Sequence, residues 1–263
     1  MLLEIVFTYK IVLALLLPLA GTTLGSAMVF LLKKDVNPKL LKTLLGFASG
    51  VMIAASIWSL LIPAIEAYGD GAKKWAVPSI GFAIGIIFLL FLDMVIPHEH
   101  INKVEEGPHN NKITEQLKML LAVTIHNIPE GLAVGVVIAG VFTNTITDSA
   151  ALTLSIGIAI QNFPEGAIIS MPLKETGVSK LKAFFFGFLS GVVEPLASML
   201  AILLTAFVDA ILPYTLSFAA GAMMYVVIEE LIPEANDGEH SNLPTIGFAI
   251  GFIIMMILDV ALG

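Results

Sequence analysis

The chain has 263 residues, of which 57% are hydrophobic and 13% are charged. No water-soluble domain of this size needs so much apolar surface to fill its core, so the composition predicts a membrane protein. The net charge of −8, without any basic cluster, argues against nucleic-acid binding. Cysteine is absent, which excludes disulfides and thiolate metal sites and leaves His, carboxylate, amide and thioether groups as metal ligands.

Apolar stretches long enough to cross the hydrocarbon core of about 30 Å recur along the whole sequence. The first is longer than the core of a usual signal peptide, so we interpret it as a membrane helix. The sequence thus predicts an all-α integral membrane protein with a single transmembrane domain over residues 1–263. Its eight predicted spans are residues 11–32, 43–66, 76–97, 115–140, 149–172, 181–207, 212–233 and 243–262.

The lysines predict how the spans are oriented. Three of the thirteen basic residues, Lys10, Lys73 and Lys74, fall on one side of the membrane. The positive-inside rule therefore places both termini on the non-cytoplasmic side. The ten lysines on the opposite, cytoplasmic side are Lys33, Lys34, Lys39, Lys42, Lys103, Lys112, Lys118, Lys174, Lys180 and Lys182.

Two pairs of spans repeat each other in sequence. The third span contains PSIGFAIGIIFLLFLDMVI, and the eighth contains PTIGFAIGFIIMMILDVAL. The second and seventh spans also match, but Gly50 and Pro63 are one residue further apart than Gly221 and Pro233. The matching spans are five positions apart in the chain, so they cross the membrane in opposite directions.

A third repeat lies inside the first two, because HNIPEG at 126–131 recurs as QNFPEG at 161–166 on the next span. The pattern predicts a 3+2+3 arrangement in which spans 1–3 are related to 6–8 and span 4 to span 5. Inverted repeats of this kind are typical of secondary transporters, which place the substrate site at the midplane. The alternative is a duplicated scaffold that transports nothing.

The middle of the predicted membrane contains a group of ionisable and amide side chains. A carboxylate at this depth costs at least a few kcal/mol, so such groups normally face a cavity, a bound cation or one another. His126 and Glu130 are four residues apart and share one helix face, as do Gln161 and Glu165. The full set is His126, Asn127 and Glu130 in the fourth span, Gln161, Asn162 and Glu165 in the fifth, and Glu194 in the sixth.

Prolines accompany these motifs at Pro129, Pro164 and Pro195. A proline has no backbone N–H, so the carbonyl oxygen one turn earlier in the helix loses its hydrogen-bond donor. For Pro129 and Pro164 these are the carbonyl oxygens of Ile125 and Ile160, which lie near the polar side chains. Such carbonyls are tolerated at membrane depth where they line a cavity. Kinks that serve only helix packing are the alternative, but they leave the adjacent carboxylates unexplained.

A His nitrogen among several carboxylate oxygens suits divalent ions such as Zn²⁺, Fe²⁺ or Mn²⁺. Three carboxylates and one His can hold one or two such ions. Glu130 and Glu165 are placed to bridge two adjacent ions. The groups that favour a second ion position are Asn127, Gln161, Asn162 and Glu194.

HNIPEG, QNFPEG and GVVEP, in this order and spacing, resemble the ZIP family of divalent metal transporters, in particular its GufA-like branch. The resemblance implies a binuclear metal centre on His126, Asn127, Glu130, Gln161, Asn162, Glu165 and Glu194. It also implies that Met52 approaches the first metal, although Met52 reads equally well as packing. Many relatives have an acidic residue at Asn162 and His at Gln161, so the second position here is less anionic and is expected to bind more weakly.

The resemblance further implies that spans 1, 4, 5 and 6 carry the metal and that spans 2, 3, 7 and 8 form a scaffold. Small residues on the third and eighth spans permit close helix contact. This contact is expected either within the chain or in a homodimer through these two spans. The residues concerned are Gly81 and Gly85 and their repeats Gly247 and Gly251.

Other polar residues have simpler interpretations. Glu229 and Glu230 form either an entrance or exit site or an end-of-helix pair that reaches toward water. Asp93 and Asp259 occupy matching repeat positions, where capping or bonding between helices is expected. Residues 98–114 form a short cytoplasmic loop that either captures released metal or is simply solvated, with His98, Glu99, His100, Glu105, Glu106 and His109.

The sequence thus predicts a transporter that moves Zn²⁺ toward the cytoplasm and lies in the inner cell membrane, with Fe²⁺, Mn²⁺ or Cd²⁺ as other substrates. No nucleotide-binding motif is present, so ion gradients or membrane potential must drive it. A membrane-embedded metal-dependent hydrolase is the main alternative, because His and Glu at a metal can activate water. A transporter of protons or organic solutes is the second alternative.

Overall fold

The computed structural model describes residues 2–31, 37–99, 105–108, 114–175, 177–205 and 209–263. In these residues eight helices are long and apolar enough to span a membrane. Each coincides with one predicted span, and no boundary differs by more than five residues, so the predicted all-α membrane fold is confirmed. Lys33, Lys34, His100, Lys103, His109 and Lys112 lie outside the described residues.

Six spans are single helices, namely α1 (Leu2–Leu31), α4 (Lys73–Val95), α5 (Glu115–Phe142), α6 (Asp148–Glu175), α7 (Lys180–Thr205) and α10 (Leu243–Leu262). A short 3-10 turn, η2 (Asp209–Ile211), comes directly before the seventh span. The second span is divided into α2 (Pro38–Ala55), η1 (Ser56–Leu61) and α3 (Ile62–Glu66), and the seventh into α8 (Leu212–Val226), η3 (Val227–Leu231) and α9 (Ile232–Asn236).

The divided spans contain π-helical turns at corresponding places. Both η1 and η3 are π-helices, and each is followed directly by an isoleucine and a proline, Pro63 or Pro233. The η1 turn has six residues and the η3 turn has five. A π-turn accommodates an extra residue within a helix. The one-residue difference between the two repeats therefore falls within, or close to, the two π-turns.

Helix ends follow local capping chemistry. The Asn37 side chain accepts a 2.9 Å bond from the backbone N–H of Lys39, and Pro38 occupies the first helical position of α2. Thr114 caps α5 by accepting from the N–H of Leu117 at 3.4 Å. The prolines inside α5 and α7 do not interrupt these helices.

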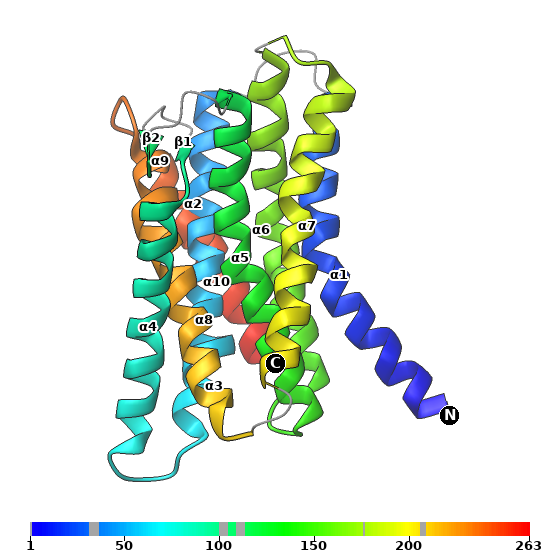
Figure 1. Cartoon of the computed structure of the whole chain (residues 1–263), viewed down its shortest axis with the longest axis vertical. Helices are drawn as coiled ribbons and strands as arrows, with labels where there is room; N and C mark the ends of the chain where they lie inside the picture. The colour runs from blue at the N-terminus through cyan, green and yellow to red at the C-terminus, as the bar shows by residue number, and fades with distance from the viewer. Residues whose placement is uncertain (1, 32–36, 100–104, 109–113, 176, 206–208) are drawn as a thin grey trace.

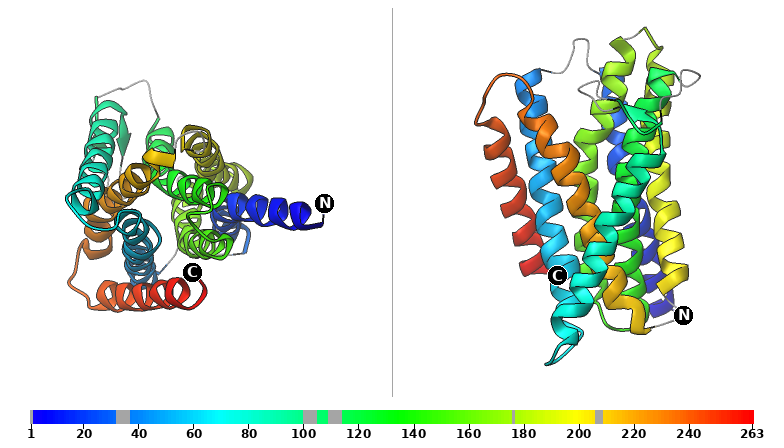
Figure 2. Two further views of the ribbon diagram at one scale, coloured as in Figure 1. Left: turned by 90° about the horizontal axis from the view of Figure 1, so that it is seen from below. Right: turned by 60° about the vertical axis from the view of Figure 1, so that its left-hand side comes forward.

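The helices form an elongated bundle with both chain termini at one end (Figure 1). Around α5, which runs through the middle, α6 and α7 pack on one side and α8 on the other, while α1 packs on α6 and α7. The N-terminal part of α1 leaves the bundle at an angle (Figures 1 and 2). Pro18 lies inside α1, and an internal proline is the usual cause of such a bend.

The predicted small-residue contacts lie within the chain. A Cβ added at Gly85 of α4 would come 2.0 Å from the carbonyl oxygen of Phe218 on α8. One added at Gly251 of α10 would come 2.1 Å from the carbonyl oxygen of Phe47 on α2. The third span therefore packs on the seventh and the eighth packs on the second, and these glycine faces are buried inside the bundle.

The outer faces of α4 and α10 are apolar. Their exposed side chains include Ile80, Ile84, Ile87, Ile246, Ile250 and Ile257. Surfaces of this kind suit lipid rather than water. The bundle thus has an apolar exterior, and its mainly apolar interior encloses a group of polar side chains.

The predicted cytoplasmic loop begins with two short strands. In β1 (His98–Glu99) and β2 (Glu105–Glu106), His98 pairs with Glu106 and Glu99 with Glu105 in antiparallel register. His98 is fully buried, its Nδ1 lies 2.8 Å from the carbonyl oxygen of Ile96, and its Nε2 lies 3.5 Å from Oδ1 of Asp93. His98 is therefore part of the protein interior rather than of a solvated loop.

Candidate metal centre

The polar motifs lie on helices in mutual contact, namely α5, α6 and α7. Across the α5–α6 contact, Nε2 of Gln161 donates a 2.6 Å hydrogen bond to Oε1 of Glu130. Across the α5–α7 contact, Nδ2 of Asn127 donates to Oε1 of Glu194 at 3.2 Å and to the carbonyl oxygen of Ser190 at 3.0 Å. Four of the predicted ligands are thus linked in pairs, and each pair connects two helices.

A fourth helix reaches the same group. Thr22 of α1 is fully buried, and its hydroxyl donates a 2.8 Å hydrogen bond to Oε1 of Glu194. No residue of α1 is among the ligands predicted from the sequence. A lone threonine in an apolar helix is common, so the only available signal was the small, polar run GTTLGS from Gly21.

Several buried oxygens of this group have no hydrogen-bond donor among the described residues. They are Asn127 Oδ1, Glu130 Oε2, Gln161 Oε1, Asn162 Oδ1 and Glu194 Oε2. A buried acceptor without a donor costs roughly 1–3 kcal/mol, and more when it is charged. The arrangement is therefore incomplete as a purely internal network, but a cation that accepts oxygen ligands would complete it.

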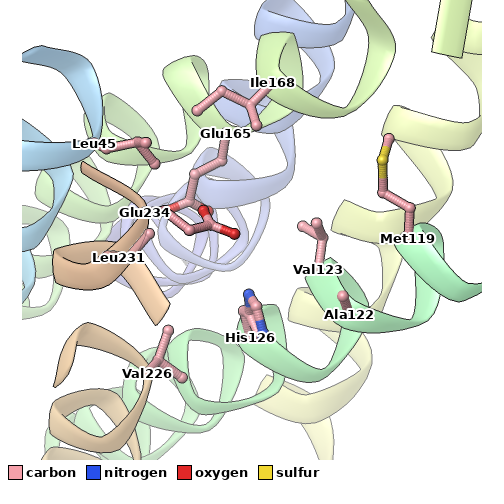
Figure 3. Close-up of a pocket in the computed structure, with 10 residues that line it drawn as sticks. All are labelled: Leu45, Met119, Ala122, Val123, His126, Glu165, Ile168, Val226, Leu231 and Glu234. Carbon is pink, nitrogen blue, oxygen red and sulfur yellow. The ribbon is translucent and has the colours of Figure 1, made fainter. Parts of the chain in front are cut away.

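His126 and Glu165 face a different space. Together with Glu234 of α9 they line a small cavity of about 30 Å³ whose other walls are mainly apolar. Figure 3 shows the two carboxylates and the imidazole directed toward this shared space. Glu165 is 8% exposed, and it lies within electrostatic range of Glu130 and of Glu234. The cavity therefore adjoins the hydrogen-bonded group of Glu130.

Glu229 and Glu230 were predicted together, as an entrance or exit site or as an end-of-helix pair, but the structure separates them. Glu230 is 2% exposed, and its Oε2 forms an ion pair with Nε2 of His126. Glu229 is exposed and lines a different hollow with Asp93 and Tyr225. Glu230 and Glu234 thus belong to the surroundings of the candidate site, although no motif marked them.

Two more residues from the sequence analysis can be placed. Met52 is fully buried in the main hydrophobic cluster and does not line the cavity of His126, so its approach to a metal stays a prediction. Both aspartates bond between helices, as expected: Oδ2 of Asp93 accepts from the Tyr225 hydroxyl and Oδ1 of Asp259 from the Ser59 hydroxyl, each at 2.5 Å.

All seven predicted ligands of the motifs are buried or nearly so, and the largest exposed fraction is 12%, for the side chain of His126. None is directed to lipid. Within the described ranges, however, no three His, Asp or Glu side chains are arranged to hold one ion.

Comparison with known proteins gives an independent result. The family model described as "ZIP Zinc transporter" matches residues 97–259. Zinc transporter ZIP11 of Xenopus tropicalis is 36% identical over 92% of this chain and 94% of its own length. Zinc transporter GufA of Myxococcus xanthus is 35% identical over 93% and 96%.

A third relative extends the comparison to another group of bacterial proteins. Zinc transporter ZupT of Chlorobaculum parvum is 34% identical over 91% of this chain and 93% of its own length. All three relatives match more than nine tenths of the chain. The chain therefore belongs to the ZIP family of zinc transporters.

Proposed function

We propose that this protein moves Zn²⁺ into the cytoplasm through a binuclear site at the middle of α5, α6 and α7. Members of the family are transporters, not enzymes, so the hydrolase alternative is set aside. The observation that carries the proposal is the group of buried oxygens without donors. A divalent ion supplies the positive charge that this group lacks.

The first ion position is formed by His126, Glu130 and Glu165, with Met52 as a further ligand. The second is formed by the remaining predicted residues together with Glu130 and Glu165, which bridge the two positions. Three of these residues are amides, so the second position carries less negative charge and binds more weakly. The ligands assigned to the second position are Asn127, Glu130, Gln161, Asn162, Glu165 and Glu194.

The cavities support release toward the cytoplasm. The cavity of His126 and Glu165 shares the wall residues Leu45 and Glu234 with a surface hollow of about 1500 Å³. Asp237, Glu239 and His240 line that hollow. An acidic path of this kind lowers the energy of a departing cation.

Lysine positions support the same direction and the proposed location in the inner cell membrane. The hollow lies at the end of the bundle opposite the two termini (Figure 1). Six described lysines belong to helix ends on that side, which the positive-inside rule assigns to the cytoplasm. They are Lys39, Lys42, Lys118, Lys174, Lys180 and Lys182.

The transport cycle follows from movement between two groups of helices. We assign α1, α5, α6 and α7 to the metal-carrying group, and the second, third, seventh and eighth spans to the scaffold. Contacts of α1 with α6 and of α5 with α7 support the first group, and contacts of α2 with α10 and of α4 with α8 support the second. The inverted repeats provide two related states that open to opposite sides.

A homodimer through α4 and α10 remains part of the proposal, with one change. The glycine faces of these helices are occupied within the chain. Two copies would therefore meet through the outward apolar faces that carry Ile84 and Ile250.

Purified protein in vesicles that contain a zinc-sensitive dye tests the site. We expect Glu130→Ala and Glu165→Ala to abolish zinc uptake, because each removes a carboxylate from the first ion position. Glu66→Ala is the matched control, since this carboxylate is exposed at the end of α3. Unchanged uptake in both site variants would refute the assignment, and the same vesicles with Fe²⁺, Mn²⁺ or Cd²⁺ define the substrate range.

A further inference from the structure

We propose that Thr22 of α1 is a positioning residue that orients the carboxylate of Glu194 for metal binding. The proposal rests on the function proposed above. It assigns α1 a direct part in the metal centre, although α1 carries none of the metal-binding motifs.

The hydrogen bonds on Glu194 are unevenly divided between its two oxygens. Both side-chain donors bond to Oε1: the Thr22 hydroxyl at 2.8 Å and Nδ2 of Asn127 at 3.2 Å. Oε2 is buried and receives no donor from the described part of the chain. Two donors on one oxygen fix the rotation of the carboxylate and leave the other oxygen available to a cation.

The Thr22 hydroxyl has a second acceptor within reach, the carbonyl oxygen of Pro18 at 3.3 Å. A hydroxyl has one proton to donate, so the two acceptors compete for it. The shorter distance and the stronger acceptor both favour Glu194. A hydroxyl that served only α1 would bond within its own helix, as Thr23 does to the carbonyl oxygen of Leu19 at 2.6 Å.

Close helix packing fixes the position of Thr22. A Cβ added at Gly191 of α7 would lie 2.9 Å from Cβ of Thr22, and one added at Gly166 of α6 would lie 2.1 Å from the Thr22 carbonyl oxygen. One turn further on, the Ser26 hydroxyl bonds to the carbonyl oxygen of Gly166 at 3.2 Å. The backbone of α1 is therefore held against two site helices, and the Thr22 side chain has little room to move away from Glu194.

This geometry predicts a specific effect on metal binding. Supporting partners of metal ligands typically change affinity about 10- to 100-fold when they are removed. Thr22→Val keeps the shape of the side chain but removes the donor. We expect the zinc concentration for half-maximal uptake to rise about 10-fold, while Thr22→Ser, which keeps the hydroxyl, restores a value close to that of the unchanged protein.

The matched control is Thr23→Val, which removes the neighbouring hydroxyl that bonds only within α1. Thermal unfolding with and without Zn²⁺ separates the site from general stability, because a ligand stabilises only the state that binds it. Thr22→Val should reduce the zinc-dependent rise in Tm, and Thr23→Val should leave it unchanged. The proposal is overturned if Thr22→Val binds and transports zinc normally, or if Thr22→Ser is as impaired as Thr22→Val.

Glu194→Gln distinguishes failure of this inference from failure of the proposed function. If Glu194→Gln transports zinc normally, the assigned second position and the role of Thr22 are both wrong. If Glu194→Gln is impaired but Thr22→Val is not, only the role of Thr22 is wrong. If both are impaired, adding Thr22→Val to Glu194→Gln should cause no further loss, since Thr22 acts through that carboxylate.

Discussion

Two buried acidic clusters in this protein differ in how their charges are satisfied. At the end of α4, Oδ2 of Asp93 accepts a hydrogen bond from Tyr225, and Oδ1 lies 3.5 Å from Nε2 of His98, so each oxygen of this carboxylate faces a polar protein group. At the middle of α5 and α7, Glu130 and Glu194 each have one oxygen with partners and one without a donor among the described residues.

The difference shows how a structural carboxylate can be distinguished from a ligand-binding one. Both clusters pay the desolvation penalty for buried charge. The Asp93 cluster offsets it with protein groups that connect α4, α8 and β1. In the Glu130 and Glu194 cluster the protein offsets only part of the desolvation penalty, and a bound cation would offset the rest. Zinc should therefore stabilise this region far more than the Asp93 cluster.

Glu234 tests a carboxylate outside both clusters. It faces Glu165 across the cavity and also lines the surface hollow. We expect Glu234→Gln to lower the maximal rate of zinc uptake roughly 10-fold, equal to about 1.4 kcal/mol in the release barrier. Zinc affinity at equilibrium should change little, because the ligands on α5, α6 and α7 are kept.

Rapid zinc-uptake measurements and equilibrium binding to the same preparation check this prediction. Glu66→Gln serves as the control for loss of one exposed carboxylate. A maximal rate equal to that of the unchanged protein would show that the release path does not pass Glu234.

Tyr225→Phe disrupts the Asp93 cluster. It removes the donor to Oδ2 of Asp93 and should lower the free energy of unfolding by about 2 kcal/mol, as for a buried hydrogen bond to a charged group. Zinc uptake per folded molecule should stay within about twofold of the unchanged protein, because such a loss acts on folding rather than on the metal centre.

Thermal unfolding in detergent, combined with uptake normalised to folded protein, measures both quantities. Tyr214→Phe is a suitable control, since the Tyr214 side chain is exposed. A large loss of uptake with unchanged stability would mean that the Asp93 cluster takes part in transport.

Asn162→Asp should have the smallest effect. Asn162 lies close to the carboxylates of Glu130 and Glu194, so the substitution adds a negative charge near the second ion position. We expect the apparent zinc affinity to rise a few fold, roughly 3-fold, with lower stability in metal-free protein.

Zinc titrations followed by Tm detect both changes. Asn127→Asp provides the contrast, because its amide donates two hydrogen bonds that an aspartate would lose. Weaker zinc binding in Asn162→Asp would show that this side chain does not face the metal.

Much of the fold was predictable because lipid imposes a simple length and hydrophobicity rule. The eighth span, predicted as residues 243–262, coincides with Leu243–Leu262. The second span began five residues earlier than predicted, since Asn37 and Pro38 provide a start signal that hydrophobicity alone does not reveal. The π-turns were not predicted, because hydrogen-bond register inside a helix leaves no pattern of its own.

The candidate site was predictable where side-chain type reveals it. Glu130, Gln161 and Glu194 stood out as polar residues in apolar helices, and the structure brings them into linked pairs. Thr22 and the ion pair of His126 with Glu230 did not stand out. Those contacts depend on the rotation of each helix about its own axis relative to its neighbours. Close packing at glycines determines that rotation, and a single sequence does not reveal it.

The paired π-turns have a consequence for how this protein tolerates change in length. An α-helix rotates about 100° per residue, so one inserted residue would normally move all later side chains to a different face of the helix. In η1 and η3 the surplus residue is taken up locally. The part of each span before the π-turn can therefore keep its glycines packed against a neighbouring helix. The part after the π-turn can present its side chains in a direction that does not depend on that packing.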